Sequence, residues 1–182
     1  LSWMDEPTKQ MAYEKIRMLV KNVAYPDWIM QDSELDNYYR ELNLQPTFDQ
    51  YTSQNTYWRF AAAKLWDSYG QPERRDDDSW IMVLTTVNAW YMPSYNSITF
   101  PAGILNSPTY RSDWPKAINY GGIGSVMGHE LTHGFDNSGV NFDATGAYNP
   151  WIDANSTAGF DQMAQCVVDQ YSQYCYDLPA NR

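Results

Sequence analysis

The chain contains two histidines, and both lie in one pentapeptide, His129-Glu130-Leu131-Thr132-His133. This is the H-E-x-x-H spacing, and on a helix it places the two histidines on one face with about 6 Å between their Cβ atoms. Two imidazoles so placed can reach one tetrahedral zinc ion, and the intervening glutamate lies next to the same metal. The pattern therefore predicts a helix around residues 129–133 that carries part of a zinc site.

The same five residues predict a chemistry. We expect His129 and His133 to be zinc ligands and Glu130 to be the general base that accepts a proton from the attacking water. Zinc lowers the pKa of a bound water towards neutrality and polarises a carbonyl, so hydrolysis can proceed without a covalent intermediate. The motif thus favours a hydrolase that uses Zn²⁺ as its cofactor.

A catalytic zinc site needs a third protein ligand, and the sequence offers none of the usual ones. The longer H-E-x-x-H-x-x-G-x-x-H pattern fails, because Asp136 and Gly139 stand where it has glycine and histidine. No glutamate follows Glu130. Asp136 and Asp169 could in principle ligate, although we interpret each as structural or facing solvent. We therefore expect the third ligand to be absent from these 182 residues.

Composition narrows the classes of partner. The chain has 12 Lys plus Arg against 22 Asp plus Glu, a formal net charge of -10, which argues against binding to nucleic acid or anionic lipid. No apolar run is long enough to cross a bilayer. The 15 Tyr, 8 Trp and 6 Phe are compatible with a cleft that binds peptides, since aromatic rings bury large areas at little entropic cost.

The charged stretch Glu73–Asp78 is interpreted as a solvated loop that separates a helical subregion, residues 1–78, from a zinc peptidase region, residues 79–182. Overall the pattern predicts an α+β fold that is mainly helical. Periodicity and capping residues predict helices over residues 5–25, 34–42, 47–69, 121–135 and 158–176, and a strand over 80–91 paired in antiparallel with 97–100.

The two cysteines, Cys166 and Cys175, lie nine residues apart in the last predicted helix. A helix would place them on opposite faces, roughly 13 Å apart along its axis, so they cannot bridge each other there. Either both are free thiols, as is usual in cytosolic proteins, or each pairs with a cysteine that this chain lacks. The sequon Asn155-Ser156-Thr157 is compatible with a secreted, glycosylated surface.

Several longer motifs resemble the neprilysin and endothelin-converting enzyme family of zinc metallopeptidases, and the resemblance extends over essentially the whole chain. The motifs are Trp3–Asp5 (WMD), Val87–Tyr91 (VNAWY), Ile98–Leu105 (ITFPAGIL) and Ile118–Asp136 (INYGGIGSVMGHELTHGFD). The resemblance implies part of a thermolysin-like (gluzincin) catalytic lobe with a short antiparallel strand region and an active-site helix. It also implies a secreted or cell-surface ectodomain several times longer than this chain.

By position, the resemblance makes His129 and His133 zinc ligands and Glu130 the general base. It implies that Asn88 and Ala89 bind the main chain of a peptide substrate. An extended peptide can add to an exposed strand edge through backbone hydrogen bonds, while side-chain pockets set the preference. The implied substrates are therefore peptides, cleaved on the amino-terminal side of an apolar residue.

The resemblance also implies features at the edge of the site and outside the chain. Ile104 and Val126 would line the pocket beyond the scissile bond. The third zinc ligand would be the glutamate of a G-E-N-x-x-D motif, which has not begun by Arg182, so we expect a missing carboxy-terminal polypeptide to supply it. That polypeptide would also hold the partner of Cys166, whereas Cys175 departs from the common pattern.

Two functions follow from these observations. The first is a segment of an extracellular zinc metalloendopeptidase that is inactive alone because it lacks the third ligand. The alternative is a non-catalytic fragment that binds peptides or another protein, and the missing glutamate motivates it. The metal affinity of the chain, measured together with its peptidase activity, distinguishes the two.

Overall fold

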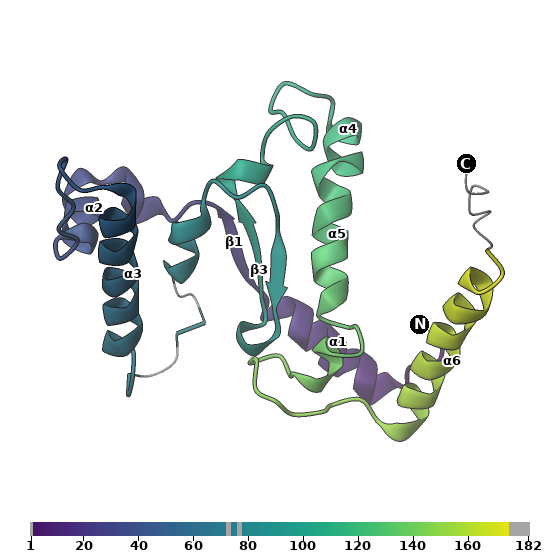
Figure 1. Cartoon of the computed structure of the whole chain (residues 1–182). Helices are drawn as coiled ribbons and strands as arrows, with labels where there is room; N and C mark the ends of the chain where they lie inside the picture. Colours follow the sequence, from purple (N-terminus) through teal and green to yellow (C-terminus); the bar gives the residue numbers. More distant parts are fainter. Residues whose placement is uncertain (1, 72–73, 76–77, 175–182) are drawn as a thin grey trace, which may run out of the picture. The chain divides into compact units, whose positions relative to one another are not determined.

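The computed structural model describes residues 2–71, 74–75 and 78–174 (Figure 1). These residues are mainly helical with one three-stranded sheet, which confirms the predicted α+β class. Contacts divide the chain into two compact units. The first holds the described parts of 1–21, 90–98 and 124–182, and the second those of 22–89 and 99–123. The division into a helical subregion, 1–78, and a peptidase region, 79–182, stays a prediction.

The first helix, α1 (Glu6–Arg17), begins where the sequence predicts. The Asp5 side chain accepts a hydrogen bond from the Thr8 amide at 2.8 Å, and a proline stands in the first turn. The predicted continuation of this helix to Pro26 is wrong. Val20–Ala24 forms strand β1 instead, and the Val20 amide donates to the Asn96 carbonyl at 3.0 Å. Strand pairing has overridden a helical periodicity that local sequence alone supports.

The sheet contains β1, β2 (Trp90–Met92) and β3 (Ser97–Pro101), in the order β1-β3-β2. Figure 1 shows β1 and β3 side by side. The predicted pairing of the strand ending near Tyr91 with residues 97–100 is confirmed. A short 3-10 turn, η3 (Pro93–Tyr95), joins β2 to β3, and Asn96 closes it with a φ of 42°. Asparagine tolerates this left-handed conformation better than most residues.

The predicted strand over residues 80–91 is wrong for most of its length. Only Trp90–Met92 is strand, whereas Asp78–Val83 forms the 3-10 helix η2. Trp80 and Ile81 are buried there, so the apolar run serves a short helical turn rather than a pleated edge. A short apolar run cannot be assigned to strand or helix by its composition alone.

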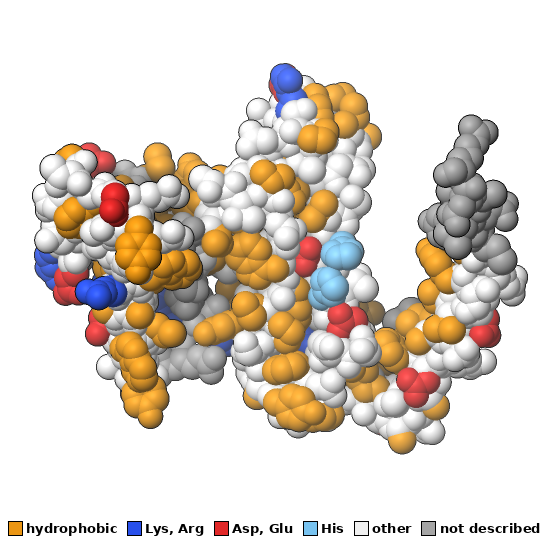
Figure 2. Space-filling view, viewed as in Figure 1, with side chains coloured by type: hydrophobic (Ala, Val, Ile, Leu, Met, Phe, Trp, Pro, Cys, Tyr) orange, Lys and Arg blue, Asp and Glu red, His pale blue; other side chains and the backbone are white. Residues whose placement is uncertain are grey.

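The second unit contains α2 (Asp32–Tyr39), α3 (Gln50–Asp67) and two 3-10 turns, η1 (Asp27–Met30) and η4 (Ala102–Ile104). The two predicted helices are confirmed with shifted ends. Trp66 of α3 is 72% exposed, whereas Phe60 is 5% exposed and marks the packed side of the helix. Phe60 packs against Tyr38 and Tyr39 of α2. Figure 2 shows hydrophobic side chains exposed over α3.

The histidine helix is preceded by a break. The sequence predicts one helix over 121–135, whereas the structure has α4 (Lys116–Gly121) and α5 (Ile123–His133). Gly122 lies between them, and a Cβ there would overlap the carbonyl oxygen of Thr109. The same carbonyl accepts a hydrogen bond from the Ile123 amide at 2.8 Å. Close packing against backbone therefore explains this glycine.

The last helix, α6 (Ala154–Tyr171), starts four residues before the predicted position. Asp153 caps it by accepting hydrogen bonds from the amides of Asn155 and Ser156. Cys166 lies on this helix as an exposed free thiol, and Cys175 lies outside the described residues. Within the described part of the chain, no helix has the length and apolar character needed to span a membrane.

Candidate metal centre

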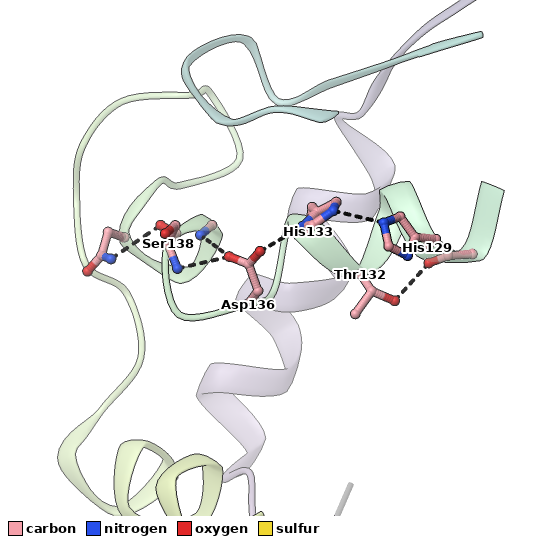
Figure 3. Close-up of polar contacts among 8 residues, drawn as sticks. His129, Thr132, His133, Asp136 and Ser138 are labelled. Carbon is pink, nitrogen blue, oxygen red and sulfur yellow. Dashed lines mark hydrogen bonds and ion pairs between the residues drawn. The ribbon is translucent and has the colours of Figure 1, made fainter. Parts of the chain in front are cut away.

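Helix α5 presents both histidines in a convergent arrangement (Figure 3). The Nε2 atoms of His129 and His133 are 3.1 Å apart, and the rings stand nearly perpendicular, at 88°. Two nitrogens that each lie 2.0–2.1 Å from one tetrahedral zinc ion are about 3.4 Å from each other. The observed separation is close to that value, so the two histidines fit a shared zinc ion.

The three residues of the motif differ in burial. The side chain of His133 is 46% exposed, and His129 is also exposed, whereas Glu130 is 6% exposed. Figure 2 shows the two imidazoles at the surface of the first unit. The two imidazoles are thus accessible from solvent, and the glutamate lies in a more enclosed position beside them.

Asp136 contacts one of the two histidines. Its Oδ2 is 2.8 Å from Nδ1 of His133, and its Oδ1 accepts hydrogen bonds from the amides of Ser138 and Gly139, both at 2.8 Å. Figure 3 shows the carboxylate between the imidazole and the turn. A carboxylate on Nδ1 favours the proton on that nitrogen, which leaves the lone pair of Nε2 free for a metal.

The charge of Asp136 is stabilised in this position. Partial burial raises the pKa of its carboxyl group, but the hydrogen bonds from His133, Gly139 and Ser138 outweigh burial and hold the pKa below its ordinary value. The alternative that Asp136 is itself a zinc ligand loses support, because both of its oxygens are already engaged. The i,i+3 spacing from His133 is the sequence signal that could have suggested this orienting role.

Asp169, the other aspartate considered as a ligand, accepts a hydrogen bond from Gln165 on its own helix at 2.7 Å. Over residues 2–71, 74–75 and 78–174, no group of three His, Cys, Asp or Glu side chains is placed to hold a metal ion. Beside the two histidines, the described part of the chain therefore places no third side chain that would complete the ligand set of a catalytic zinc.

Two glycines fix the backbone immediately after α5. A Cβ at Gly134 would lie 3.2 Å from the ring of Tyr91, and one at Gly139 would overlap the carbonyl oxygen of His133. Gly139 also begins the 3-10 turn η5 (Gly139–Asn141). The chain therefore folds tightly back on the end of α5, which brings the amides of residues 138 and 139 to Asp136.

The remaining predicted site residues have varied positions. Asn88 and Ala89 precede β2 rather than lying within a strand, and the Ala89 amide donates to Oδ1 of Asn88 at 2.9 Å. They belong to the second unit, as does Ile104, which is buried in η4. Val126 lies on α5, half-buried. Their predicted roles in binding substrate stay predictions.

The predicted modification sites lie on α6. Asn155 is exposed in the first turn of the helix, and Thr157 of the same sequon donates to the Asp153 carbonyl at 2.9 Å. Ser156, between them, is buried and accepts a hydrogen bond from the Asp5 amide at 3.2 Å. Asn155 is therefore sterically open to modification at one end of an ordered helix.

The mainly helical α+β fold and the helix that carries both histidines are those of the gluzincin fold class. Residues 88–181 match the model of Peptidase family M13, and the chain belongs to this family. Among curated proteins, it is 40% identical to Neprilysin-1 of Caenorhabditis elegans over 174 residues, which cover 93% of the chain. It is 41% identical to Endothelin-converting enzyme 1 of Homo sapiens over 179 residues, or 96% of the chain.

Solved structures agree with this assignment. The chain superposes on PepO from Lactobacillus rhamnosis with a TM-score of 0.79 and 33% identity, covering 96% of this chain and 26% of that one. It superposes on the zinc metalloprotease Zmp1 of Mycobacterium tuberculosis with a TM-score of 0.77 and 31% identity, covering 99% and 26%. The chain spans 22% of the length of the two curated relatives named above.

Proposed function

We propose that the chain is the segment of a zinc metalloendopeptidase of the neprilysin type that carries the general base and two of the three zinc ligands. The convergence of Nε2 of His129 and Nε2 of His133, 3.1 Å apart on one helix face, carries this proposal. Family membership supports peptide-bond hydrolysis. The structural neighbour Zmp1, a zinc metalloprotease, supports zinc as the metal.

The residues divide the chemistry between them. Zinc, when bound, supplies the polarisation of the scissile carbonyl and the acidity of the attacking water. Glu130 takes the proton of that water on its carboxylate and passes it to the departing amine. This transfer needs a group that can both accept and release a proton. Asp136 keeps the proton of His133 on Nδ1, so that Nε2 stays a ligand throughout.

The third ligand is proposed to come from polypeptide outside these 182 residues. Two observations support this. No glutamate follows Glu130 in the sequence, and the described residues bring no third side chain to the two histidines. The chain by itself is then inactive as a peptidase, because a two-ligand site cannot hold zinc tightly enough to work. The lack of a third ligand favours the alternative, a non-catalytic fragment that binds peptides or another protein, for the isolated chain only.

The substrates are proposed to be peptides that bind in an extended form and are cut before an apolar residue. Asn88 and Ala89 would bind the peptide main chain, and Ile104 and Val126 would contact the apolar side chain. The exposure of Asn88 supports the first role, and the apolar character of the other two residues supports the second. A net charge of -10 makes nucleic acid an unfavourable partner.

The protein is proposed to work outside the cell, secreted or as a cell-surface ectodomain. The exposed Asn155 would then carry a glycan. Cys166 and Cys175 would form disulfides with cysteines outside this chain. The exposure of Cys166 supports this, since its sulfur is accessible to a partner.

Two substitutions in the full protein that contains this chain test the proposal. Glu130→Gln should lower kcat by at least about 100-fold and leave zinc bound, because the amide keeps the shape of the side chain but cannot take a proton. His133→Ala should lose the metal itself. Zinc content and cleavage of a quenched peptide are measured on the same samples. Retention of more than about a tenth of the wild-type kcat by Glu130→Gln would refute the assignment of the base.

A further inference from the structure

One buried cation lies close to the metal centre but has no part in the chemistry described above. Lys15, on α1, is 1% exposed. Its Nζ donates hydrogen bonds to the carbonyl oxygens of Gly139 and Phe142, each at 2.6 Å. In Figure 1, α1 lies beside the carboxyl end of α5. Lys15 thus ties the first helix to the turn that follows the histidine helix.

The surroundings of this ammonium group are unusual for a lysine. Within the described part of the chain, no carboxylate lies within salt-bridge distance of Nζ. Three aromatic rings surround it instead, with centroids 5.7–5.9 Å away, those of Tyr91, Phe135 and Trp151. Burying a charge is costly, and apolar residues would fill such a core at lower cost. The two carbonyl contacts are therefore the specific feature that a lysine adds here.

Those carbonyls belong to the turn that holds Asp136. Gly139 accepts from Lys15 through its carbonyl oxygen and donates its amide to Oδ1 of Asp136 at 2.8 Å. The other oxygen of Asp136 contacts Nδ1 of His133, also at 2.8 Å. A continuous series of polar contacts thus leads from Lys15 to His133, through one residue of the turn and one carboxylate.

A second buried side chain fixes the same region from the other side. Asn96 is fully buried, and its Nδ2 donates to the carbonyl oxygens of Lys15 and Ala144, at 2.9 and 3.0 Å. Its Oδ1 accepts from the hydroxyl group of Tyr91 at 2.9 Å. The backbone of α1 at Lys15 is therefore held by Asn96, while the Lys15 side chain reaches the turn.

We propose that Lys15 is a positioning residue for the zinc site, which fixes the turn at Gly139 and Phe142 so that Asp136 holds His133 in the orientation that binds metal. The inference rests on the proposed role of His133 as a ligand. Lys15 touches neither metal nor substrate. Its effect passes through Asp136, and removing an orienting partner of a ligand typically costs 10- to 100-fold in metal affinity.

The test compares Lys15→Met with a matched control in the full protein that contains this chain. Methionine keeps an unbranched chain of similar length but cannot donate to the two carbonyls. The control is Thr8→Val, on the same helix, where a fully buried hydroxyl group donates to Asp153 at 2.8 Å, away from the turn. Both variants lose buried hydrogen bonds, so both should lose stability. Only Lys15→Met should affect the metal site.

Two measurements compare the effects of Lys15→Met and Thr8→Val on the metal site. Zinc affinity is measured by competition with a chromophoric chelator, and we expect Lys15→Met to weaken it about 10- to 100-fold while Thr8→Val stays within about threefold of wild type. The second readout is the Nδ1–H resonance of His133 in zinc-free protein with ¹⁵N-labelled histidine. It should broaden or disappear in Lys15→Met and persist in Thr8→Val.

A double substitution tests the route. If Lys15 acts through Asp136, then Lys15→Met combined with Asp136→Asn should weaken zinc no more than Asp136→Asn alone. Fully additive losses would contradict that route. Equal zinc affinity and an unchanged His133 resonance in Lys15→Met and Thr8→Val would overturn the proposal altogether.

Two further measurements apply if Lys15→Met does not fold or if the wild-type protein does not bind zinc. If Lys15→Met does not fold, Lys15→Gln, which retains a shorter neutral donor, is judged by the same two readouts. If wild-type protein binds zinc no better than His133→Ala, then the proposed function fails, and the resonance in zinc-free protein still decides whether Lys15 positions Asp136 and His133.

Discussion

Single residues in the turn after α5 hold that turn against the end of the histidine helix. Gly139 is the most constrained of them. Its amide holds Asp136, its carbonyl accepts from Lys15, and a Cβ at its position would overlap the carbonyl oxygen of His133. The end of α5 and the turn are therefore in direct contact, and nothing larger than glycine fits without moving one of them.

Gly139→Ala should lower the free energy of unfolding by about 1–3 kcal/mol, the usual cost of forcing an extra carbon into a packed site. Gly128→Ala is the matched control, because Gly128 lies inside α5 with nothing within 4 Å of a Cβ. That substitution should be neutral or stabilising by up to about 1 kcal/mol, since alanine favours helix over glycine. Urea unfolding measures both. A stable Gly139→Ala would show that the turn is free to move.

At the scale of secondary-structure elements, the buried lysine of α1 gives the first unit a particular pH dependence. Burial lowers the pKa of Lys15 from 10.5 to about 8, and the attraction of Asp143 and then Asp136 opposes that shift only in part. Between about pH 8 and 10.5, the unfolded chain holds a proton on Lys15 that the native chain has lost. The contribution of Lys15 to the free energy of unfolding should therefore rise with pH across this window.

The expected size is about 3 kcal/mol, because each pKa unit corresponds to about 1.4 kcal/mol. The measurement is urea unfolding of zinc-free wild type and Lys15→Met at pH 7 and near pH 10, so that groups common to both proteins cancel. The stability of wild type relative to Lys15→Met should increase at the higher pH. A constant difference, or one that decreases, would mean that burial does not lower the pKa of Lys15 in the native protein.

The helices and the short strands differ in how far the sequence predicts them. The helix with His129 and His133 can be predicted because the chemistry of the motif requires both side chains on one face. The caps at Asp5 and Asp153 contribute local hydrogen bonds, and the sequence predicts the start of the first helix but places that of the second four residues too late. The sequence does not predict strand β1, and the strand that it predicts over 80–91 is too long. Pairing and burial determine the secondary structure of such short apolar segments.

The residues of the candidate site also differ in how far the sequence predicts them. The spacing of the motif predicts the ligands and the base, whereas the contacts of Asp136 and Lys15 depend on how the turn after α5 folds back. Asp136 could have been suggested by its distance of three residues from His133. Lys15 could not, since 124 residues separate it from Gly139.

At the scale of the whole molecule, the chain covers 22% of the length of the curated relatives described above. Each of the two compact units has exposed apolar side chains. Trp66 on α3 is an example in the second unit, and Tyr171 on α6 is an example in the first. We propose that polypeptide outside these residues supplies the third zinc ligand. Zinc that bridges two polypeptide segments should stabilise their association, because metal binds only the assembled site.

The zinc affinity of residues 1–182, measured alone and again with the downstream polypeptide present, tests this account most directly. Competition with a chelator at neutral pH gives both values, and cleavage of a quenched peptide is followed in parallel. We expect weak binding and no cleavage by the chain alone, with tight binding and chelator-sensitive cleavage when the downstream polypeptide is added. Nanomolar binding and equal cleavage by residues 1–182 alone would contradict the account, and would show that this chain supplies the third ligand.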